Sequence, residues 1–253
     1  MTDSSNKNDR SCGRCREHEG NHIDFTMAFQ PIVDIRDNTV FAYEALVRGH
    51  NLDDTSTAVL AKVNDSNRYH FDQACRVRAI ELAAQLHIPC FLSINFLPKA
   101  VFEPSACIRR TLDAAARLGF PTNRIIFEFT ENQEIVDRQH LTNIVRQYQR
   151  LGFKTAIDDF GDGYAGLNLL TEFRPDFIKL SDTFVHDIHR DQVRSSIVKG
   201  VLAICADLGI QVIAESIESE AQLARLKELG IYLFQGFLFA RSEVEALPQV
   251  RQH

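Results

Sequence analysis

Oxygen-bearing side chains follow short apolar runs throughout this chain of 253 residues. The side chains in these positions are Glu44, Asn95, Glu128, Asp158, Asp159 and Glu215, with Lys179 and Gln235 in equivalent places. If such carboxylates converged, they would repel one another and resist ionisation unless cations were present. A set of carboxylate and amide oxygens without His or Cys suits Mg²⁺ or Mn²⁺ better than Zn²⁺. These residue types therefore predict a site for hard divalent metals.

The adjacent acids Asp158 and Asp159 indicate more than one ion. Consecutive side chains of a strand normally diverge, but a turn after Ile157 can aim both at neighbouring metals. Asp158 would then bridge two ions while Asp159 holds one. Metals about 3.5–4 Å apart clamp a phosphodiester and activate a water for in-line attack. A helix cap or a surface role would explain any one acid, but not all of them at matched positions.

The segments around these residues predict an α/β fold. The apolar runs are rich in Val, Ile, Phe and Tyr, as in strands buried on both faces. Amphipathic helices are expected before them, at 71–86, 103–118, 138–151, 195–208 and 219–229. A (β/α)8 TIM-type barrel would gather the strand ends at one rim. An open doubly wound sheet fits the same rhythm, but it would not bring polar ends from the whole chain to one crevice.

The start of the barrel is expected to depart from the parallel pattern. The apolar runs at 25–33 and 40–47 flank a turn-like DIRDN segment, which predicts a hairpin. One antiparallel strand would therefore lie near the start of the sheet.

Composition limits the class of protein. The chain is 45% hydrophobic with a net charge of −6, which argues against binding nucleic-acid polymers. A small anionic substrate remains compatible, because bound metals reverse the local charge. No apolar run approaches the roughly 18 residues of a membrane helix, so membrane insertion is not expected. The amino terminus lacks the apolar core of a signal peptide, and a cytoplasmic location is expected.

The first 22 residues are polar and weakly patterned, which predicts a disordered or loosely attached tail before a barrel domain at 23–253. We expect this tail to be dispensable for catalysis. Cys12, Cys15, His18 and His22 have spacings that permit a small zinc site. The loop between the two pairs is far shorter than in zinc fingers, which favours an inert tail.

Eight short motifs occur in the order and spacing of a known family. They are FQPIV (29–33), YEALVRG (43–49), SINFLP (93–98), FEFTE (127–131), IDDFGDGY (157–164), FIKL (177–180), AESIE (214–218) and FQGFLF (234–239). Over residues 25 to 241 the chain thus resembles the EAL-domain family of cyclic di-GMP phosphodiesterases. The resemblance implies a (β/α)8-type barrel, two Mg²⁺ or Mn²⁺ ions, and hydrolysis of cyclic di-GMP to linear pGpG. It also implies a homodimer formed near the loop after Asp159.

The resemblance also implies roles for individual residues. The first metal would be held by Glu44, Asn95, Glu128 and Asp158, and the second by Asp158, Asp159 and Glu215, directly or through water. Lys179 would meet the attacking water or a phosphate oxygen, although a lysine extending from a strand end is the plainer alternative. Gln30 and Gln235 would be substrate-side or water-holding amides, and Arg48 would contact the substrate. Glu131 and Glu218 would steady the loop after Asp159. Arg48 shares a strand face with Glu44, and a structural ion pair is the alternative for it.

Five positions depart from the family pattern. Ser181 stands where the family usually has Asp, Asp162 where Thr or Ala is commoner, Ala165 and Gly166 where two serines are commoner, and Ser242 where Pro is usual. None of these changes removes an implied metal ligand, but Ser181 and Asp162 are expected to affect the rate. We expect Ser181→Asp to raise turnover if the missing acid supports Lys179 or a water.

The retained acids favour an enzyme over the alternatives. Degenerate members of the family, which bind cyclic di-GMP or a protein partner without hydrolysis, lose the Glu of the naming motif or an Asp of the DDF pair. This chain keeps Glu44, Asp158 and Asp159. An unrelated magnesium-dependent barrel enzyme acting on sugar phosphates would require the motif series to be coincidental.

Overall fold

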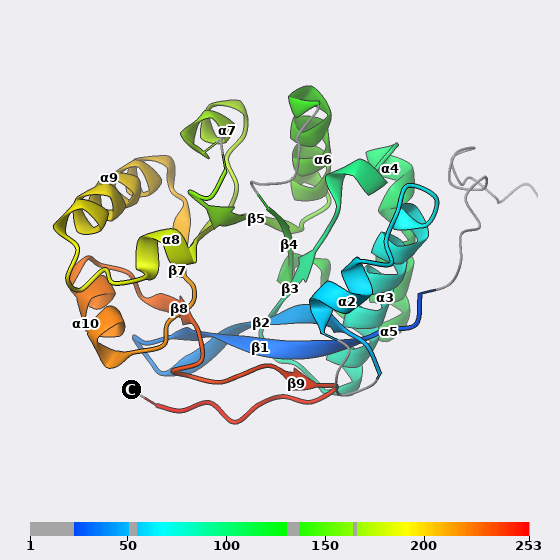
Figure 1. The fold of residues 1–253 in the computed structure, drawn as a ribbon. Coiled ribbons are helices and arrows are strands. Elements are labelled where there is room, and N and C mark those ends of the chain that lie inside the picture. The colour runs from blue at the N-terminus through cyan, green and yellow to red at the C-terminus, as the bar shows by residue number, and fades with distance from the viewer. Residues whose placement is uncertain (1–22, 51–54, 131–136, 164–165, 253) are drawn as a thin grey trace, which may run out of the picture.

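Eight strands close into a barrel in the computed structural model, which describes residues 23–50, 55–130, 137–163 and 166–252 (Figure 1). The strands are β1 (Thr26–Asp34), β2 (Thr39–Arg48), β3 (Phe91–Asn95), β4 (Ile125–Thr130), β5 (Lys154–Phe160), β6 (Phe177–Leu180), β7 (Gln211–Ala214) and β8 (Leu233–Gln235). Strands β2 to β8 are parallel to their neighbours, and β1 closes the ring by antiparallel pairing with β2 and β8. A short ninth strand, β9 (Glu243–Val244), pairs with the free part of β1. The predicted TIM-type barrel and its antiparallel strand are confirmed.

In the hairpin of β1 and β2, the position of Glu44 differs from the one expected from the sequence. Glu44 lies inside β2 rather than at its end, because antiparallel pairing with β1 continues from Glu44 to Arg48. Its Cα lies opposite Gln30 on β1 and Ser93 on β3. Glu44 therefore lies deeper in the barrel than a residue at a strand end would.

Helices surround the ring of strands (Figure 1). They are α2 (Ser56–Leu60), α3 (Arg68–Gln85), α4 (Pro104–Cys107), α5 (Arg109–Leu118), α6 (Arg138–Arg150), α7 (Gly166–Glu172), α8 (Asp182–Val185), α9 (Gln192–Leu208) and α10 (Glu220–Glu228), with 3-10 turns at Pro98–Ala100 and Thr122–Arg124. The helix expected at 103–118 is divided at Ile108 into α4 and α5. Within the described part of the chain, no helix combines the length and apolar character needed to cross a bilayer.

The barrel interior explains which way the site residues point. Seven buried residues pack together inside it, namely Ile32, Ala42, Ile126, Ala156, Phe177, Ile213 and Leu233. Side chains two positions apart on a strand share a face. Six of these residues, those on the parallel strands, are followed two positions later by a polar residue, such as Glu44 after Ala42 and Lys179 after Phe177. These six polar side chains therefore also lie on the inward face, toward the carboxyl-terminal end of the strands. A larger apolar layer fills the space between strands and helices.

Candidate active site

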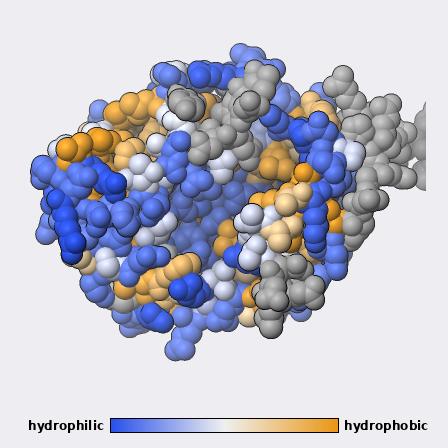
Figure 2. Space-filling model, viewed as in Figure 1, coloured by the Kyte–Doolittle hydropathy of each residue, from blue (hydrophilic) through white to orange (hydrophobic). Residues whose placement is uncertain are grey.

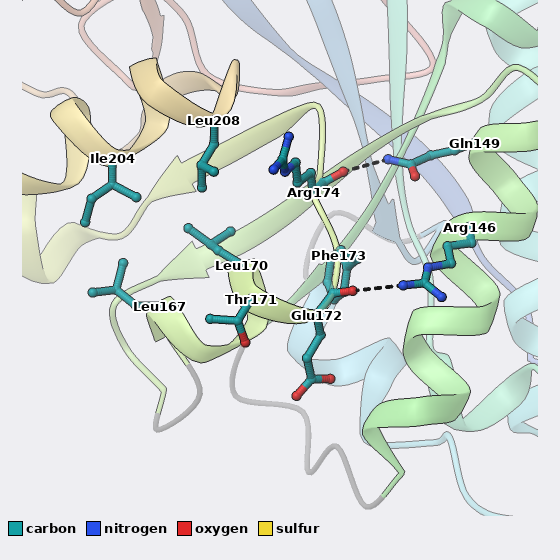
Figure 3. Close-up of a pocket in the computed structure, with 10 residues that line it drawn as sticks. All are labelled: Arg146, Gln149, Leu167, Leu170, Thr171, Glu172, Phe173, Arg174, Ile204 and Leu208. Atoms are coloured by element: carbon teal, nitrogen blue, oxygen red, sulfur yellow. Dashed lines mark hydrogen bonds between the residues drawn. The ribbon is translucent and has the colours of Figure 1, made fainter.

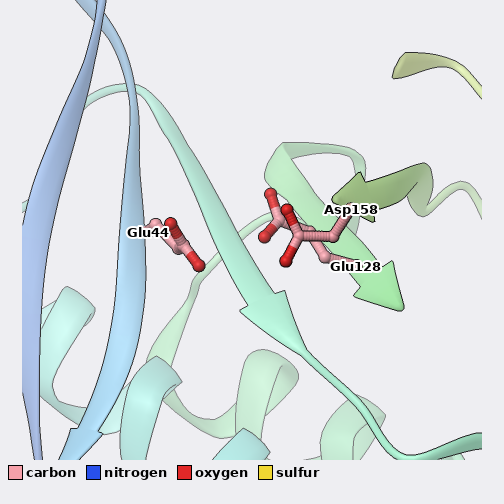
Figure 4. Close-up of side chains that lie close together, drawn as sticks. All are labelled: Glu44, Glu128 and Asp158. Atoms are coloured by element: carbon pink, nitrogen blue, oxygen red, sulfur yellow. The ribbon is translucent and has the colours of Figure 1, made fainter. Parts of the chain in front are cut away.

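Four carboxylates surround the ammonium group of Lys179 at the carboxyl-terminal end of the barrel. The Nζ atom lies 2.6 Å from Glu215 Oε1, 3.0 Å from both Glu128 Oε2 and Asp158 Oδ1, and 3.3 Å from Glu44 Oε2. Figure 4 shows Glu44, Glu128 and Asp158 extending toward one another from β2, β4 and β5. The predicted convergence of these residues is observed. Lys179 lies at the centre of the cluster, with its side chain only 1% exposed.

Burial and mutual repulsion make this cluster hard to ionise. Burial, aided by the charges of Glu44 and Asp158, raises the pKa of Glu128 to about 8 although Lys179 opposes the shift. Burial and the neighbouring Asp158 raise the pKa of Asp159 to about 6, and burial also raises the pKa of Glu215 well above its usual range. Burial alone would lower the pKa of Lys179, but the surrounding carboxylates outweigh it and raise that pKa. The site thus carries more acidic groups than one lysine can neutralise.

The donor set fits two hard cations. Oxygen atoms of Glu44, Glu128 and Asp158 lie within 4.8 Å of one another, as do oxygen atoms of Asp158, Asp159 and Glu215. The two groups share Asp158, the residue expected to bridge. Carboxylate oxygens at this spacing suit Mg²⁺ or Mn²⁺, and added positive charge would relieve the repulsion described above.

A β-bulge explains how consecutive acids reach the same site. The pairing of β5 with β6 shifts register between Ile157 and Phe160, and Asp159 has a left-handed φ of 51°. The extra residue of a bulge re-aims a side chain that would otherwise face away. The expected turn after Ile157 is therefore a bulge within β5, which continues to Phe160. The strained conformation of Asp159 at a cluster of acids is itself a mark of a functional position.

Neutral side chains donate hydrogen bonds to two of the carboxylates, those of Glu44 and Glu128. Asn95 Nδ2 donates to Glu44 Oε1 at 2.9 Å, and Gln235 Nε2 donates to Glu44 Oε2 at 2.7 Å. Gln235 also lies 3.3 Å from Gln30 Oε1. The Ser93 hydroxyl donates to Glu128 Oε1. Ser93 was not singled out from the sequence, although its position two residues before Asn95 on the same strand face was a usable signal.

The remaining predicted residues lie around this centre. The guanidinium of Arg48 at the end of β2 donates to the hydroxyl of Ser56 and, at 3.1 Å, to that of Ser242. Glu218 is exposed and lines a hollow together with Glu215 and Gln235. Glu131 lies outside the described residues, as do the tail residues Cys12, Cys15, His18 and His22.

The departures at Ser181 and Asp162 turn out to be in contact. Ser181 is buried at the end of β6, and its hydroxyl donates to Asp162 Oδ1 at 2.8 Å. The neighbouring acid Asp182 is exposed in the first turn of α8. It therefore does not replace the acid that the family usually has at position 181.

Two hollows differ in their relation to the acidic cluster. One of about 210 Å³ is lined by Gln30, Glu44, Glu215, Ser216, Glu218, Gln235, Gly236 and Phe237, and so opens onto the predicted site. Figure 2 shows hydrophilic residues gathered in the depression at the centre of this face. A larger groove of about 630 Å³ lies apart from it, between α6, α7 and α9 (Figure 3). The smaller hollow is the candidate substrate site, because only it contains members of the cluster.

A closed barrel with a buried, carboxylate-rich centre at its carboxyl-terminal rim has the architecture of a TIM-type barrel, and its acidic groups are placed where a metal ion could be held. The EAL domain family matches residues 17–242, and the chain belongs to this family.

Solved structures of the family are similar along most of the chain. A standalone EAL protein from Vibrio cholerae O395, solved in a c-di-GMP bound form, is 51% identical with a TM-score of 0.88, covering 92% of this chain and 98% of that one. BlrP1 from Klebsiella pneumoniae, solved as a manganese and cyclic di-GMP complex, is 33% identical with a TM-score of 0.85, covering 92% of this chain and 59% of that one.

Relatives known by sequence differ in their stated roles. The antirepressor BluF of Escherichia coli K12, described as regulated by blue light and temperature, is 31% identical over 88% of this chain and 55% of its own length. The cyclic di-GMP phosphodiesterase RocR of Pseudomonas aeruginosa PAO1 is 35% identical over 67% of this chain and 42% of its own length. The chain thus spans about half the length of these relatives, or less.

Proposed function

We propose that this chain hydrolyses cyclic di-GMP to linear pGpG with two Mg²⁺ or Mn²⁺ ions. The supporting observation is the pair of carboxylate groups that share Asp158 around Lys179. Glu44, Asn95, Glu128 and Asp158 would hold one ion, and Asp158, Asp159 and Glu215 the other. When bound, two such ions polarise the phosphodiester and activate the attacking water. The named phosphodiesterases among the relatives, RocR included, support this substrate and reaction.

The residues of the chain supply the rest of the chemistry. Lys179, buried and held charged by its neighbours, would stabilise negative charge on a phosphate oxygen or orient the attacking water. Gln30 and Gln235 line the small hollow and present amides to a substrate there. Arg48, fixed by two hydroxyls, would offer its planar fork to a phosphate or a guanine edge. Hydrolysis would lower the concentration of the second messenger in the cytoplasm.

A second function, binding of cyclic di-GMP or a protein partner without hydrolysis, is favoured by one comparison. BluF, whose description is that of an antirepressor, matches most of this chain. The retained cluster of carboxylates favours the enzyme, because a receptor would have no need of acids whose ionisation is resisted by burial.

Chromatography of the products separates the two functions. Purified protein is incubated with cyclic di-GMP and Mg²⁺ or Mn²⁺, and pGpG is expected; chelator should stop the reaction and Mn²⁺ restore it. Ca²⁺, which prefers looser coordination, should bind but support little turnover. Asp158→Asn and Glu44→Ala should lower turnover by orders of magnitude with the fold intact. Asp207→Asn, which alters an exposed acid on α9, is the matched control. Tight binding of the dinucleotide without product under either metal would replace the enzyme by the receptor.

A further inference from the structure

A buried ion pair on α3 lies directly behind the predicted metal ligands. Asp72 and Arg76 are one helical turn apart, with Asp72 Oδ2 and Arg76 Nη2 separated by 2.7 Å. Their side chains are 1% and 0% exposed. Neither residue faces the barrel interior, and neither belongs to the cluster around Lys179. The pair therefore requires its own explanation.

The carboxylate of Asp72 accepts a hydrogen bond from the backbone just after Asn95. The amide N–H of Leu97, two residues after Asn95, donates to Asp72 Oδ1 at 2.8 Å. Between them, the amide of Phe96 donates to the Glu128 carbonyl at 2.9 Å. The backbone that carries Asn95 is thus fixed to β4 on one side and to α3 on the other.

Arg76 connects this contact to the rest of the site. Its Nη1 donates to Tyr148 Oη on α6 at 2.7 Å. Its guanidinium also lies 5.4 Å from the ring centre of Phe96 and 5.1 Å from that of Phe127. Phe96 follows Asn95 and Phe127 precedes Glu128, so Arg76 packs beside the neighbours of two predicted ligands of the same ion.

Stability alone does not account for such a pair. Replacing a buried ion pair by apolar side chains of similar volume is often neutral or stabilising. What apolar side chains would not supply is an acceptor for the Leu97 amide. Residues that orient metal ligands from behind typically change metal affinity or activity by about 10–100-fold when they are altered.

We propose that Asp72 is a positioning residue that sets the location of Asn95 through the Leu97 amide, and that Arg76 and Tyr148 hold the Asp72 carboxylate in place for this purpose. The proposal rests on the proposed metal site and concerns the geometry of one of its ligands. Asp72 touches neither metal nor substrate. Its effect would appear first in metal affinity and then in turnover, with little change in substrate affinity.

Two double variants isolate the hydrogen bond from the charge. Asp72→Asn/Arg76→Met removes both charges but keeps an acceptor for the Leu97 amide. Asp72→Leu/Arg76→Met removes both charges and the acceptor, with a side chain of nearly the same shape. Titration calorimetry of the full chain with Mn²⁺ alone should give near wild-type affinity for the first and about tenfold weaker affinity for the second. Val198→Ala, which makes a cavity on α9, should lower the melting temperature without changing Mn²⁺ affinity.

Equal Mn²⁺ affinities in the two double variants, whether both strong or both weak, would overturn the proposal. A wild-type protein that binds Mn²⁺ without hydrolysing cyclic di-GMP would remove the proposed function and leave this comparison valid. Hydrogen exchange of the metal-free wild type gives a test that needs neither variant. A protected Leu97 amide supports the proposal, and one that exchanges as fast as an unbonded amide contradicts it.

Discussion

At the scale of single residues, we expect the acidic cluster to lower the stability of the metal-free fold. Asp159 has its pKa raised to about 6 by burial and by Asp158, so its charge is unfavourable in the metal-free fold. Asp159→Asn should therefore raise the melting temperature of the metal-free protein by a few degrees, as removal of a strained charge at an active site often does. The same variant should lose most of the further rise that Mn²⁺ gives to the wild type.

Thermal unfolding with and without Mn²⁺ measures both effects. Asp207→Asn removes an exposed acid far from the cluster and should change neither value. A metal-free Asp159→Asn protein that melts below the wild type would show that Asp159 is favourably placed even without an ion.

The contact of Ser181 with Asp162 changes the effect expected from restoring an acid at position 181. Ser181→Asp would set a second carboxylate beside Asp162 Oδ1, which now lies 2.8 Å from the serine hydroxyl. We therefore expect the single variant to lose activity through like-charge repulsion. Ser181→Asp with Asp162→Thr exchanges the acid and the hydroxyl between the two positions and should recover turnover.

A double-mutant cycle tests this expectation. It compares the initial rates of pGpG formation by the wild type, Ser181→Asp, Asp162→Thr and the double variant. A coupling between the two positions is expected, with the double variant more active than Ser181→Asp. Additive effects would mean that the hydrogen bond does not matter to catalysis.

Residue identity predicted the members of the cluster but not their supports. Glu44, Glu128, Asp158 and Glu215 are recognisable because polar groups at the ends of apolar runs are unusual. Asp72 and Arg76 gave no such signal, since a charged pair one turn apart on a helix normally lies on the surface. Their burial depends on Tyr148 and Phe96, which reach them only when the barrel closes.

At the scale of elements, the alternation of helices and strands could be predicted from the sequence, but the irregularities within them could not. Hydrophobic periodicity located the long helices to within a few residues. It did not reveal the break at Ile108 or the bulge in β5, because neither alters the apolar pattern. The bulge has a functional consequence, since it brings Asp158 and Asp159 to one side.

The turn after β8 gives a prediction at this scale. Gly236 follows Gln235, and a Cβ added there would lie 2.1 Å from the backbone oxygen of Ile217. The Ile217 amide in turn donates to the Gln235 carbonyl at 3.1 Å. Gly236→Ala should therefore push the end of β8, which carries Gln235, away from the segment after β7, which carries Glu215. We expect a loss of stability of about 1–3 kcal/mol together with weaker Mn²⁺ binding.

Urea unfolding and Mn²⁺ titration of Gly236→Ala test this expectation. Gly200→Ala is the matched control, because a Cβ at Gly200 in α9 meets nothing within 4 Å. The control should be more stable than the wild type by about 0.5–1 kcal/mol. Equal stabilities of Gly236→Ala and the wild type would show that the turns can separate without harm.

At the scale of the whole molecule, closure of the barrel assembles the site from strands distant in sequence. Glu44 and Gln235 are hydrogen-bonded although 191 positions separate them, because β1 joins β2 to β8. Closure of the barrel could be predicted from the sequence, because residues with polar side chains follow apolar runs along the whole chain. The distances around Lys179 could not be predicted, since they depend on how far along its strand each residue lies, as the position of Glu44 within β2 shows.

The surface of the barrel provides a place for the predicted homodimer. The larger groove has an apolar floor formed by Leu167, Leu170, Ile204 and Leu208, and Arg146, Glu172 and Arg174 also line it (Figure 3). Leu167 is 49% exposed on α7, the helix that follows the loop after Asp159. An apolar groove with polar surroundings beside that loop is typical of an interface between protein chains.

We therefore expect two copies of the chain to associate through this groove. Leu167→Asp would place a charge in the contact and should weaken association at least tenfold, a change of about 1.4 kcal/mol or more. Leu60→Asp alters a comparably exposed leucine, 45% exposed, on α2 and should leave association unchanged. Sedimentation equilibrium over a range of concentrations measures both variants against the wild type. A wild type that remains monomeric, or a Leu167→Asp variant that associates as the wild type does, would place the interface elsewhere or remove it. Because α7 is the next helix after β5, the strand that carries Asp158 and Asp159, loss of the dimer should also lower turnover of cyclic di-GMP in Leu167→Asp but not in Leu60→Asp.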